Sequence, residues 1–277
     1  MIKTGRSFYK LSGSGNDFVF IDARSQPVGE LDKPELVQTI CARGSGVGAD
    51  GIVFLKNDDE AAIAIRYLNS DGSLAELCGN ATLCAARLAA ELQIVDKKDE
   101  FEISTDSGRV TARFRGGLPE IDLQPVTQVQ DCFDAKPAGG EARIGFALVG
   151  VPHLVVLCAD VDRAAIVDRG RELRRHPKLA HGANVNFVSR AAEGWRVRTY
   201  ERGVEAETLA CGTGAVATGL MLATWGEASG LVELQTRSGR LLRVRHRLED
   251  GRYLASLSGE ARIVFRGELA ELSSTTT

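Results

Sequence analysis

Several common sequence signatures are missing from this chain of 277 residues. It has no C-x-x-C pair and its four histidines show no H-x-x-x-H spacing, so we expect neither a metal site nor a thioredoxin-type motif. No apolar run approaches the roughly 20 residues that span a bilayer. The first 18 residues also lack the apolar stretch of a secretory signal peptide. We therefore expect a cytoplasmic protein with no membrane partner.

An excess of one charge is missing as well. The formal net charge is −3, so no global field attracts nucleic acid or a membrane surface. The basic stretch 237–247 alternates arginine with apolar residues, which is typical of a strand with one solvated face, and it offers no aromatic side chains for stacking bases. The glycine-rich segment 44–48 lacks the lysine ending of a phosphate loop. Neither nucleic acid nor a nucleotide is an expected partner.

Short strand-like segments are abundant, rich in β-branched residues and often bounded by Gly, Asp or Asn. They are Phe18–Asp22, Ile52–Leu55, Ala62–Leu68, Phe101–Ser104, Val110–Phe114, Ala147–Val149, Leu154–Leu157, Val185–Ser189, Trp195–Tyr200, Val232–Gln235, Leu241–Arg247, Tyr253–Ser258 and Ala261–Phe265. Helical patterns are fewer and lie at about Lys33–Cys41, Asn80–Leu92, Val161–His176 and Thr213–Thr224. Hydrophobic residues make up 44% of the chain, which is enough for real cores. The mixture predicts an α+β fold.

An internal repeat runs through the chain. The segments that start at Ile65 and Val197 each contain a strand, a polar turn, an acidic stretch, a Cys-Gly-polar junction and a helix of small residues. In both copies a tyrosine precedes the cysteine by 11 residues. Two copies predict two similar domains that face each other across a cleft. We place the boundary in the segment 119–140, where Pro, Gly, Gln and Asp concentrate, which gives domains of residues 1–125 and 126–260.

The two junctions, Cys78–Asn80 and Cys211–Thr213, each stand at the start of a predicted helix, and Asn80 and Thr213 are good N-cap residue types. A helix start favours a thiolate and binds a carboxylate, because its N–H groups and dipole are positive. Two such starts across a cleft would hold the carboxylate of an amino acid. One thiolate would then remove the α-proton while the opposite thiol returns a proton to the other face, which inverts the α-carbon.

The remaining cysteines have no such setting. We expect them to be small buried apolar residues, the commonest fate of a free cysteine. They are Cys41, Cys84, Cys132 and Cys158.

A set of motifs resembles the diaminopimelate epimerases, in that family's order and over nearly the whole chain. The motifs are GSGNDF (13–18), GVGADG (46–51), LNSDGSLAELCGN (68–80), GVPH (150–153), GANVNF (182–187) and YERGVEAETLACGTGA (200–215). The resemblance implies two pseudo-symmetric domains, each a strand-rich layer wrapped around a central buried helix, with the active site in the cleft between them. It also implies that residues 261–277 return to the first domain. It implies that neither pyridoxal phosphate nor a metal takes part. It also implies that the substrate is a small diamino dicarboxylic acid.

The resemblance also implies roles for individual residues. Catalysis would fall to Cys78 and Cys211. Asn16, Asn69 and Asn184 match substrate contacts, while Glu201 and Arg202 match the pair that reads the distal end of the substrate. The carboxylate at the reacting end would lie against Gly79, Asn80, Gly212 and Thr213.

This chain departs from the family's usual pattern at a few positions. Ala81 and Leu83 replace the Gly and Arg of CGNG-x-RC, Val151 replaces the Asn of GNPH, and Gly51 stands where some members have Gln. The junction residues themselves remain, so the chemistry is expected to survive.

The leading hypothesis is a homodimeric epimerase that converts LL-diaminopimelate to the meso form for lysine and peptidoglycan synthesis. One alternative is a two-cysteine racemase of proline, hydroxyproline or histidine, which should lack the distal Glu-Arg pair. Another is a PhzF-like isomerase, which uses a carboxylate in place of the cysteine pair. A third is a non-catalytic binding protein on the same scaffold, against which the two cysteines argue.

Overall fold

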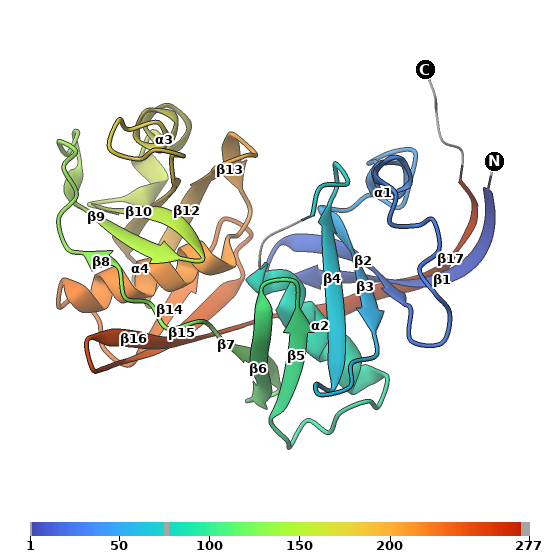
Figure 1. Cartoon of the computed structure of the whole chain (residues 1–277). Coiled ribbons are helices and arrows are strands. Elements are labelled where there is room, and N and C mark those ends of the chain that lie inside the picture. Colours follow the sequence, from blue (N-terminus) through green and yellow to red (C-terminus); the bar gives the residue numbers. More distant parts are fainter. Residues whose placement is uncertain (1, 75–77, 273–277) are drawn as a thin grey trace. The chain divides into compact units, whose positions relative to one another are not determined.

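The computed structural model describes residues 2–74 and 78–272 (Figure 1). The chain forms two compact units, one made of Met1–Ile121 with Glu260–Thr277 and the other of Asp122–Gly259. Each unit combines many strands with a few helices, as the predicted α+β class requires. Within the described ranges, the helices are too short or too polar to cross a membrane.

The first unit is a layer of strands that lie side by side in the order β17, β1, β2, β3, β4, β5, β6 and β7. Their bounds are β1 (Ile2–Gly13), β2 (Asn16–Asp22), β3 (Gly51–Lys56), β4 (Ile63–Asn69), β5 (Phe101–Thr105), β6 (Gly108–Arg115), β7 (Leu118–Asp122) and β17 (Ala261–Leu272). The pairs β2–β3 and β4–β5 are parallel and the others antiparallel. Each parallel pair is joined by a long connection, which carries α1 (Pro34–Cys41) or α2 (Gly79–Glu91).

The second unit has strands in the order β8, β9, β10, β11, β12, β14, β15 and β16. Their bounds are β8 (Val129–Gln130), β9 (Glu141–Val149), β10 (Val151–Cys158), β11 (Asn184–Arg190), β12 (Trp195–Glu201), β14 (Leu231–Gln235), β15 (Leu241–Glu249) and β16 (Arg252–Gly259). The pairs β10–β11 and β12–β14 are parallel, and their connections carry α3 (Ile166–Arg174) and α4 (Gly212–Thr224). A short strand, β13 (Ala206–Thr208), pairs with the end of β12.

The two units therefore repeat one pattern of strand pairing. The run from β1 to β7 and the run from β9 to β16, with β13 set aside, use parallel and antiparallel pairs in the same sequence. Each is extended by one further strand, β17 beside β1 and β8 beside β9. Figure 1 shows β17 alongside β1 although they come from opposite ends of the chain. The sequence repeat thus corresponds to a structural repeat.

A central helix fills each unit. In the first unit α2 packs against β1, β4, β6 and β17, and in the second unit α4 packs against β9, β10, β11, β15 and β16. Small residues make this possible, because Gly and Ala let strands approach the helix closely. For example, the Val244 side chain of β15 occupies the space beside Gly219 of α4. Helix α4 carries no charged residue and is buried over most of its length, as its sequence predicted.

The structure differs from the predicted elements in several places, and the short strands β7, β8 and β13 were not predicted. The helix expected over 161–176 is split into a 3-10 turn, η1 (Val161–Arg163), and α3, because Ala164 adopts an extended conformation with ψ 139°. The strand β1 was not expected at all. Its sequence is polar in places and bends at Gly5, so its strand character comes from pairing with β17 and β2.

Candidate active site

The first predicted cysteine, Cys78, is the N-cap residue of α2. Its backbone is extended, with φ −104° and ψ 106°, and its carbonyl oxygen accepts hydrogen bonds from the N–H and the hydroxyl of Thr82, both at 3.0 Å. The prediction that Asn80 caps this helix is therefore wrong, since Asn80 is its second residue. The side chain of Asn80 is turned inward, where it has another partner.

Asn80 and Asn16 form an amide pair at the first turn of α2. The Nδ2 group of Asn80 donates to Oδ1 of Asn16 at 2.6 Å, and Nδ2 of Asn16 donates to the Asp50 carboxylate at 2.9 Å. Asn80 is 1% exposed, and its Oδ1 atom has no hydrogen-bond partner among the described residues. The structure thus connects two predicted site residues to Asp50, which the sequence did not single out as a site residue.

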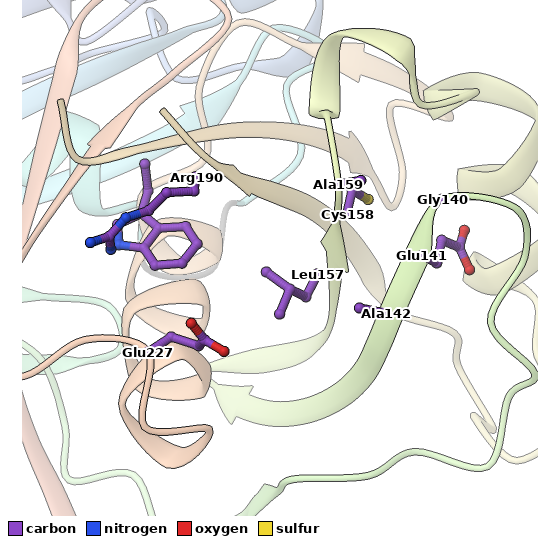
Figure 2. A pocket seen from close by; sticks show the side chains of 9 residues that line it. Gly140, Glu141, Ala142, Leu157, Cys158, Ala159, Arg190 and Glu227 are labelled. Atoms are coloured by element: carbon purple, nitrogen blue, oxygen red, sulfur yellow. The ribbon is translucent and has the colours of Figure 1, made fainter. Parts of the chain in front are cut away.

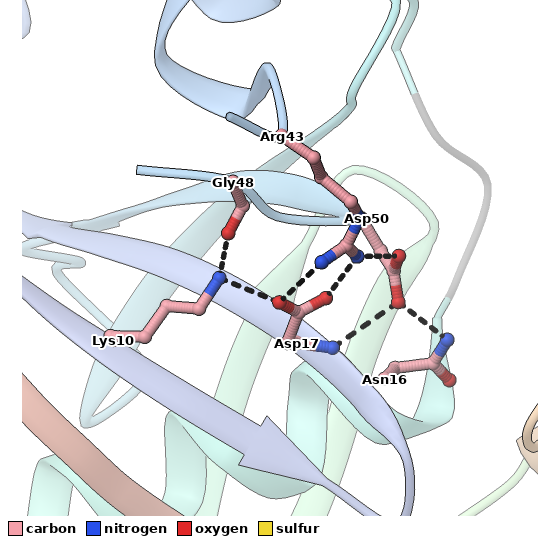
Figure 3. Close-up of polar contacts among 6 residues, drawn as sticks. All are labelled: Lys10, Asn16, Asp17, Arg43, Gly48 and Asp50. Carbon is pink, nitrogen blue, oxygen red and sulfur yellow. Dashed lines mark hydrogen bonds and ion pairs between the residues drawn. The ribbon is translucent and has the colours of Figure 1, made fainter. Parts of the chain in front are cut away.

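Asp50 belongs to a charged cluster beside β2 (Figure 3). The Arg43 guanidinium donates to Asp17 at 2.6 Å and to Asp50 at 2.7 Å, and the Lys10 ammonium donates to Asp17 at 2.7 Å. Burial would raise the pKa of the Asp17 carboxyl, but hydrogen bonds from Arg43 and Lys10 outweigh burial and lower this pKa below its usual value. The Asp17 carboxyl is therefore ionised at neutral pH.

Asn69, another predicted contact, ends β4. Its Nδ2 group donates to the Ser73 hydroxyl at 3.0 Å, and its backbone N–H donates to the Ser73 carbonyl, so this side chain also holds the turn that follows. Asn69 pairs across the sheet with Gly51. A Cβ atom at Gly51 would lie 2.4 Å from the Tyr67 ring, which explains why this chain has glycine there.

The departures Ala81 and Leu83 lie in the first half of α2. Their side chains are buried, with Leu83 fully inaccessible to solvent. They act as packing residues of the central helix and leave the Cys78–Asn80 junction in place.

The second predicted cysteine, Cys211, is the N-cap residue of α4, with φ −134° and ψ 114°. Its sulfur accepts a hydrogen bond from the Gly214 backbone N–H at 3.4 Å and lies 3.6 Å from the Thr213 hydroxyl. Thr213 is the second residue of the helix, so the prediction that it is the N-cap is also wrong. An N–H donor and a helix start directed at one sulfur stabilise a thiolate.

A buried polar network lies against the first turn of α4. The Asn186 amide donates to the Leu154 carbonyl at 3.1 Å and to Nδ1 of His153 at 3.2 Å, while the Thr199 hydroxyl donates to Asn186 Oδ1 at 2.9 Å. An amide NH₂ group cannot accept, so Nδ1 of His153 is the acceptor and its proton resides on Nε2. The Nε2 atom is buried and has no partner among the described residues.

His153 is the third residue of β10 and pairs with Asn184 of β11. Burial, with a smaller contribution from the positive charge of Arg202, lowers the pKa of His153 to about 3. The imidazole is therefore neutral at physiological pH.

Asn184 and Arg202 are joined directly. The side-chain oxygen of Asn184 accepts a hydrogen bond from the Arg202 backbone N–H at 2.7 Å, which fixes the chain where β12 ends at Glu201. The second unit thus brings Cys211, Thr213, Asn184, Glu201 and Arg202 to one region, through α4 and the ends of β11 and β12. Glu201 and Arg202 each have further interactions.

The other cysteines fall into two groups. Cys41, Cys84 and Cys158 are buried, as expected, and burial raises the pKa of Cys41 and of Cys158 to about 12. Such thiols are inert at neutral pH. Cys132 is exposed, so the expectation of burial is wrong for this residue. It follows the short strand β8, outside the packed layer.

A hollow of about 450 Å³ lies on the second unit at the carboxyl ends of β10 and β11 (Figure 2). Leu157, Arg190 and Trp195 help to line it. His153 and Asn184 lie at the amino ends of the same two strands, and the hollow includes none of the predicted site residues. Among the described residues, no three His, Cys, Asp or Glu side chains are grouped as metal ligands would be.

The network residues Asp50, Asn186 and Thr199 were missed by the site prediction. Asp50 and Asn186 both lie inside recognised motifs, GVGADG and GANVNF. The available signal was polarity at a strand position that should be apolar, since Asn186 shares the face of Asn184 in an otherwise buried strand.

Comparisons with known proteins bear on the whole chain. The family model for diaminopimelate epimerase matches residues 8–121 and 145–264. Curated relatives named diaminopimelate epimerase include one from Gemmatimonas aurantiaca, 46% identical over 96% of this chain and 100% of that protein. Another, from Aquifex aeolicus, is 40% identical over 95% of this chain and 98% of its own length.

Solved structures share the fold at much lower identity. A phenazine biosynthesis protein of the PhzF family from Bacillus anthracis has a TM-score of 0.75 and 15% identity, covering 96% of this chain and 99% of that one. A hydroxyproline epimerase from Agrobacterium vitis has a TM-score of 0.69 and 17% identity, covering 97% and 94%. These likenesses confirm the predicted two-domain α+β fold. Because the family model matches most of both units and a relative covered over its whole length is 46% identical, this chain belongs to the diaminopimelate epimerase family.

Proposed function

We propose that this chain is a cofactor-independent isomerase that converts LL-diaminopimelate to meso-diaminopimelate, a step toward lysine and peptidoglycan. The relatives that carry the name diaminopimelate epimerase support this proposal. One structural observation supports its mechanism above all others. A cysteine is the N-cap residue of the central helix in each unit, at the same place in the repeated pattern of strands.

The mechanism follows from this placement. One thiolate removes the α-proton, and the other thiol supplies a proton on the opposite face of the same carbon, so that neither a metal nor pyridoxal phosphate takes part. The carbanion that forms is stabilised through the substrate carboxylate, whose charge is held by backbone N–H groups. Backbone donors are available in the first turn of each helix, because the first N–H groups that bond within the helix are those of Thr82 in α2 and Ala215 in α4. The N–H groups of Gly79, Asn80, Gly212 and Thr213 precede them and have no intrahelical acceptor.

The distal end of the substrate carries a second ammonium and a second carboxylate. In our proposal the Arg202 guanidinium binds this carboxylate with a planar pair of donors, and Glu201 binds the ammonium. Asn184 supports the pair, since its side chain fixes the Arg202 backbone. Asn16 and Asn69 supply contacts from the first unit. The two units would act as the two epimerase domains, in a cytoplasmic homodimer.

The decisive experiment is incubation of the purified chain with LL-diaminopimelate in D₂O. The expected product is meso-diaminopimelate with deuterium at the inverted α-carbon, measured by chiral chromatography and mass spectrometry. L-proline, trans-4-hydroxy-L-proline and L-histidine serve as controls and should exchange far more slowly. Preferred turnover of one of these controls would reject the substrate but not the two-thiol chemistry. Absence of α-proton exchange with every substrate would reject an epimerase altogether.

A further inference from the structure

The Asn16–Asn80 amide pair has a fixed direction, which begins at Asp50. An ionised carboxylate can only accept hydrogen bonds, so Asp50 must accept one from the Nδ2 group of Asn16. This turns the Asn16 oxygen toward Asn80, which must in turn offer its own Nδ2 group. The last atom of the chain, Asn80 Oδ1, is then a buried acceptor at the second residue of α2, two positions after Cys78.

The starting carboxylate is held firmly. Arg43 binds the Oδ1 atom of Asp50 at 2.7 Å and bridges it to Asp17, while the Asp17 backbone N–H donates to Oδ2 of Asp50 at 3.2 Å. Lys10 completes the charge balance on Asp17. Figure 3 shows Arg43 on one side of the Asp50 carboxylate and Asn16 on the other. Two carboxylates and two cations leave the cluster close to neutral, so it can stay ionised beside the site.

The direction of the amide pair is set by the Asp50 carboxylate, through its hydrogen bond from Asn16. It leaves a buried oxygen without a donor among the described residues, and an unsatisfied buried polar atom is costly. If the Asn80 amide rotated by itself, its oxygen would face the oxygen of Asn16. Only a reversal of both amides together would satisfy Asn80 Oδ1, and the Asp50 carboxylate forbids it because it cannot donate.

We propose that Asp50 is a positioning residue for the reaction: it acts through Asn16 and fixes the direction of the Asn16–Asn80 pair at the helix start that carries Cys78. This proposal rests on the proposed function only for its kinetic readout. Asp50 itself need not touch the substrate. Its role is to keep the Asn16 Nδ2 group engaged and to keep Asn80 presenting an oxygen beside the cysteine junction.

The variant Asp50→Asn tests this proposal with almost no change in size. An asparagine at position 50 can keep its oxygen on Arg43 and offer an NH₂ group to Asn16 in place of Oδ2, which allows both amides to reverse. The Asp17 backbone N–H, which donates to Oδ2 in the wild type, then loses this acceptor. The expected loss in kcat/KM for LL-diaminopimelate is at least about tenfold, typical of a lost charge-assisted hydrogen bond. The matched control is Asp22→Asn, which neutralises an ion-paired carboxylate at the far end of β2, 2.8 Å from Arg24. It should keep wild-type kcat/KM.

A double-mutant cycle separates positioning from a general structural effect. Asn16→Ala cuts the chain of amides, so adding Asp50→Asn to it should lower kcat/KM by no more than about twofold beyond Asn16→Ala alone. If the two losses multiply, or if Asp22→Asn is as damaging as Asp50→Asn, the proposal is overturned. Thermal unfolding of each variant identifies any that fail to fold, and such variants are replaced in the cycle by Asn80→Ala.

A second readout does not depend on catalysis. The side-chain amide protons of Asn80, observed by ¹⁵N-edited NMR, are hydrogen-bonded to Asn16 in the wild type and should move upfield in Asp50→Asn but not in Asp22→Asn. Unmoved Asn80 signals in Asp50→Asn would overturn the proposal. If the wild-type chain turns over no LL-diaminopimelate while the Asn80 signals move as expected, the proposed function fails and the positioning role stands.

Discussion

The Asn186 side-chain oxygen lies 2.3 Å from the position that a Cβ atom would take at Gly214, and the Cys211 sulfur lies 3.1 Å from it. Any larger residue at position 214 would therefore displace the thiol, the buried network or both. The same glycine donates its N–H to the Cys211 sulfur. A single residue thus sets the distance between the helix start and the polar network beneath it.

The first prediction concerns this contact. Replacing a helical glycine by alanine normally stabilises a protein by up to about 1 kcal/mol. Gly214→Ala should instead destabilise it by about 1–3 kcal/mol through overpacking, and should lower kcat by at least about tenfold because Cys211 moves. Urea unfolding and steady-state kinetics measure the two effects. The control is Gly219→Ala in the same helix, whose added Cβ atom meets the Val244 side chain of β15. It should lower the free energy of unfolding but leave the activity per folded molecule unchanged.

The second prediction concerns the two N-cap cysteines. Cys78→Ala and Cys211→Ala should each lower the rate of epimerisation by at least about 100-fold, because each removes one of two obligatory proton carriers. The double variant should be little worse than either single one, since residues that act as a unit are not additive. Cys132→Ser, which changes an exposed thiol, should have wild-type activity. Normal turnover by either single variant would disprove the two-thiol mechanism.

Local sequence patterns predicted the central helices well, and physical chemistry explains why. Helix α4 lacks any charged residue, so only a fully buried position suits it, and the small residues of α2 and α4 permit close strand packing. The Cys-Gly junctions were placed correctly, but the caps were not. The cysteines themselves take the extended cap conformation, and the polar residues that follow turn to other partners.

What the sequence could not reveal depends on distant contacts. Strand β1 pairs with β17, which lies some 250 residues later, and nothing local to residues 2–13 indicates that partner. The Asp50 network likewise joins residues that are 34 and 64 positions apart. Hydrogen bonds of this kind are specified by the fold, so composition and periodicity alone do not identify them.

The third prediction concerns substrate choice. Removing one partner of a buried charged contact typically costs about 2–5 kcal/mol, so Arg202→Ala should lower kcat/KM for LL-diaminopimelate by at least ~30-fold. Arg202→Lys should recover only part of this loss, because an ammonium lacks the planar pair of donors. Arg171→Ala, which removes an exposed arginine of α3, is the control and should be neutral. Unchanged turnover of LL-diaminopimelate by Arg202→Ala would show that another residue reads the distal carboxylate.

The fourth prediction concerns pH and the buried His153. Its pKa is about 3 in the folded chain against a usual value of 6.5, so the unfolded chain binds one more proton between these limits. The free energy of unfolding therefore rises with pH across this window. Conversely, stability that is fully present above pH 6.5 is lost progressively as the pH falls toward 3. Between pH 6.5 and pH 5 the loss due to this group should be about 2 kcal/mol.

The measurement is urea unfolding at pH 6.5 and pH 5 for the wild type and for His153→Gln, which keeps a polar side chain but cannot take up the proton. Asp17 also has a shifted pKa, but it is lowered from 3.8, so its contribution changes below this range. Between pH 6.5 and pH 5, the free energy of unfolding of the wild type should fall by about 2 kcal/mol more than that of His153→Gln. His181→Gln, which removes an exposed histidine, should follow the wild type. Equal pH slopes in the wild type and His153→Gln would mean that the imidazole accepts a proton in the folded chain. Both ring nitrogens would then be donors, and Nδ1 of His153 could not accept the hydrogen bond from the Asn186 amide.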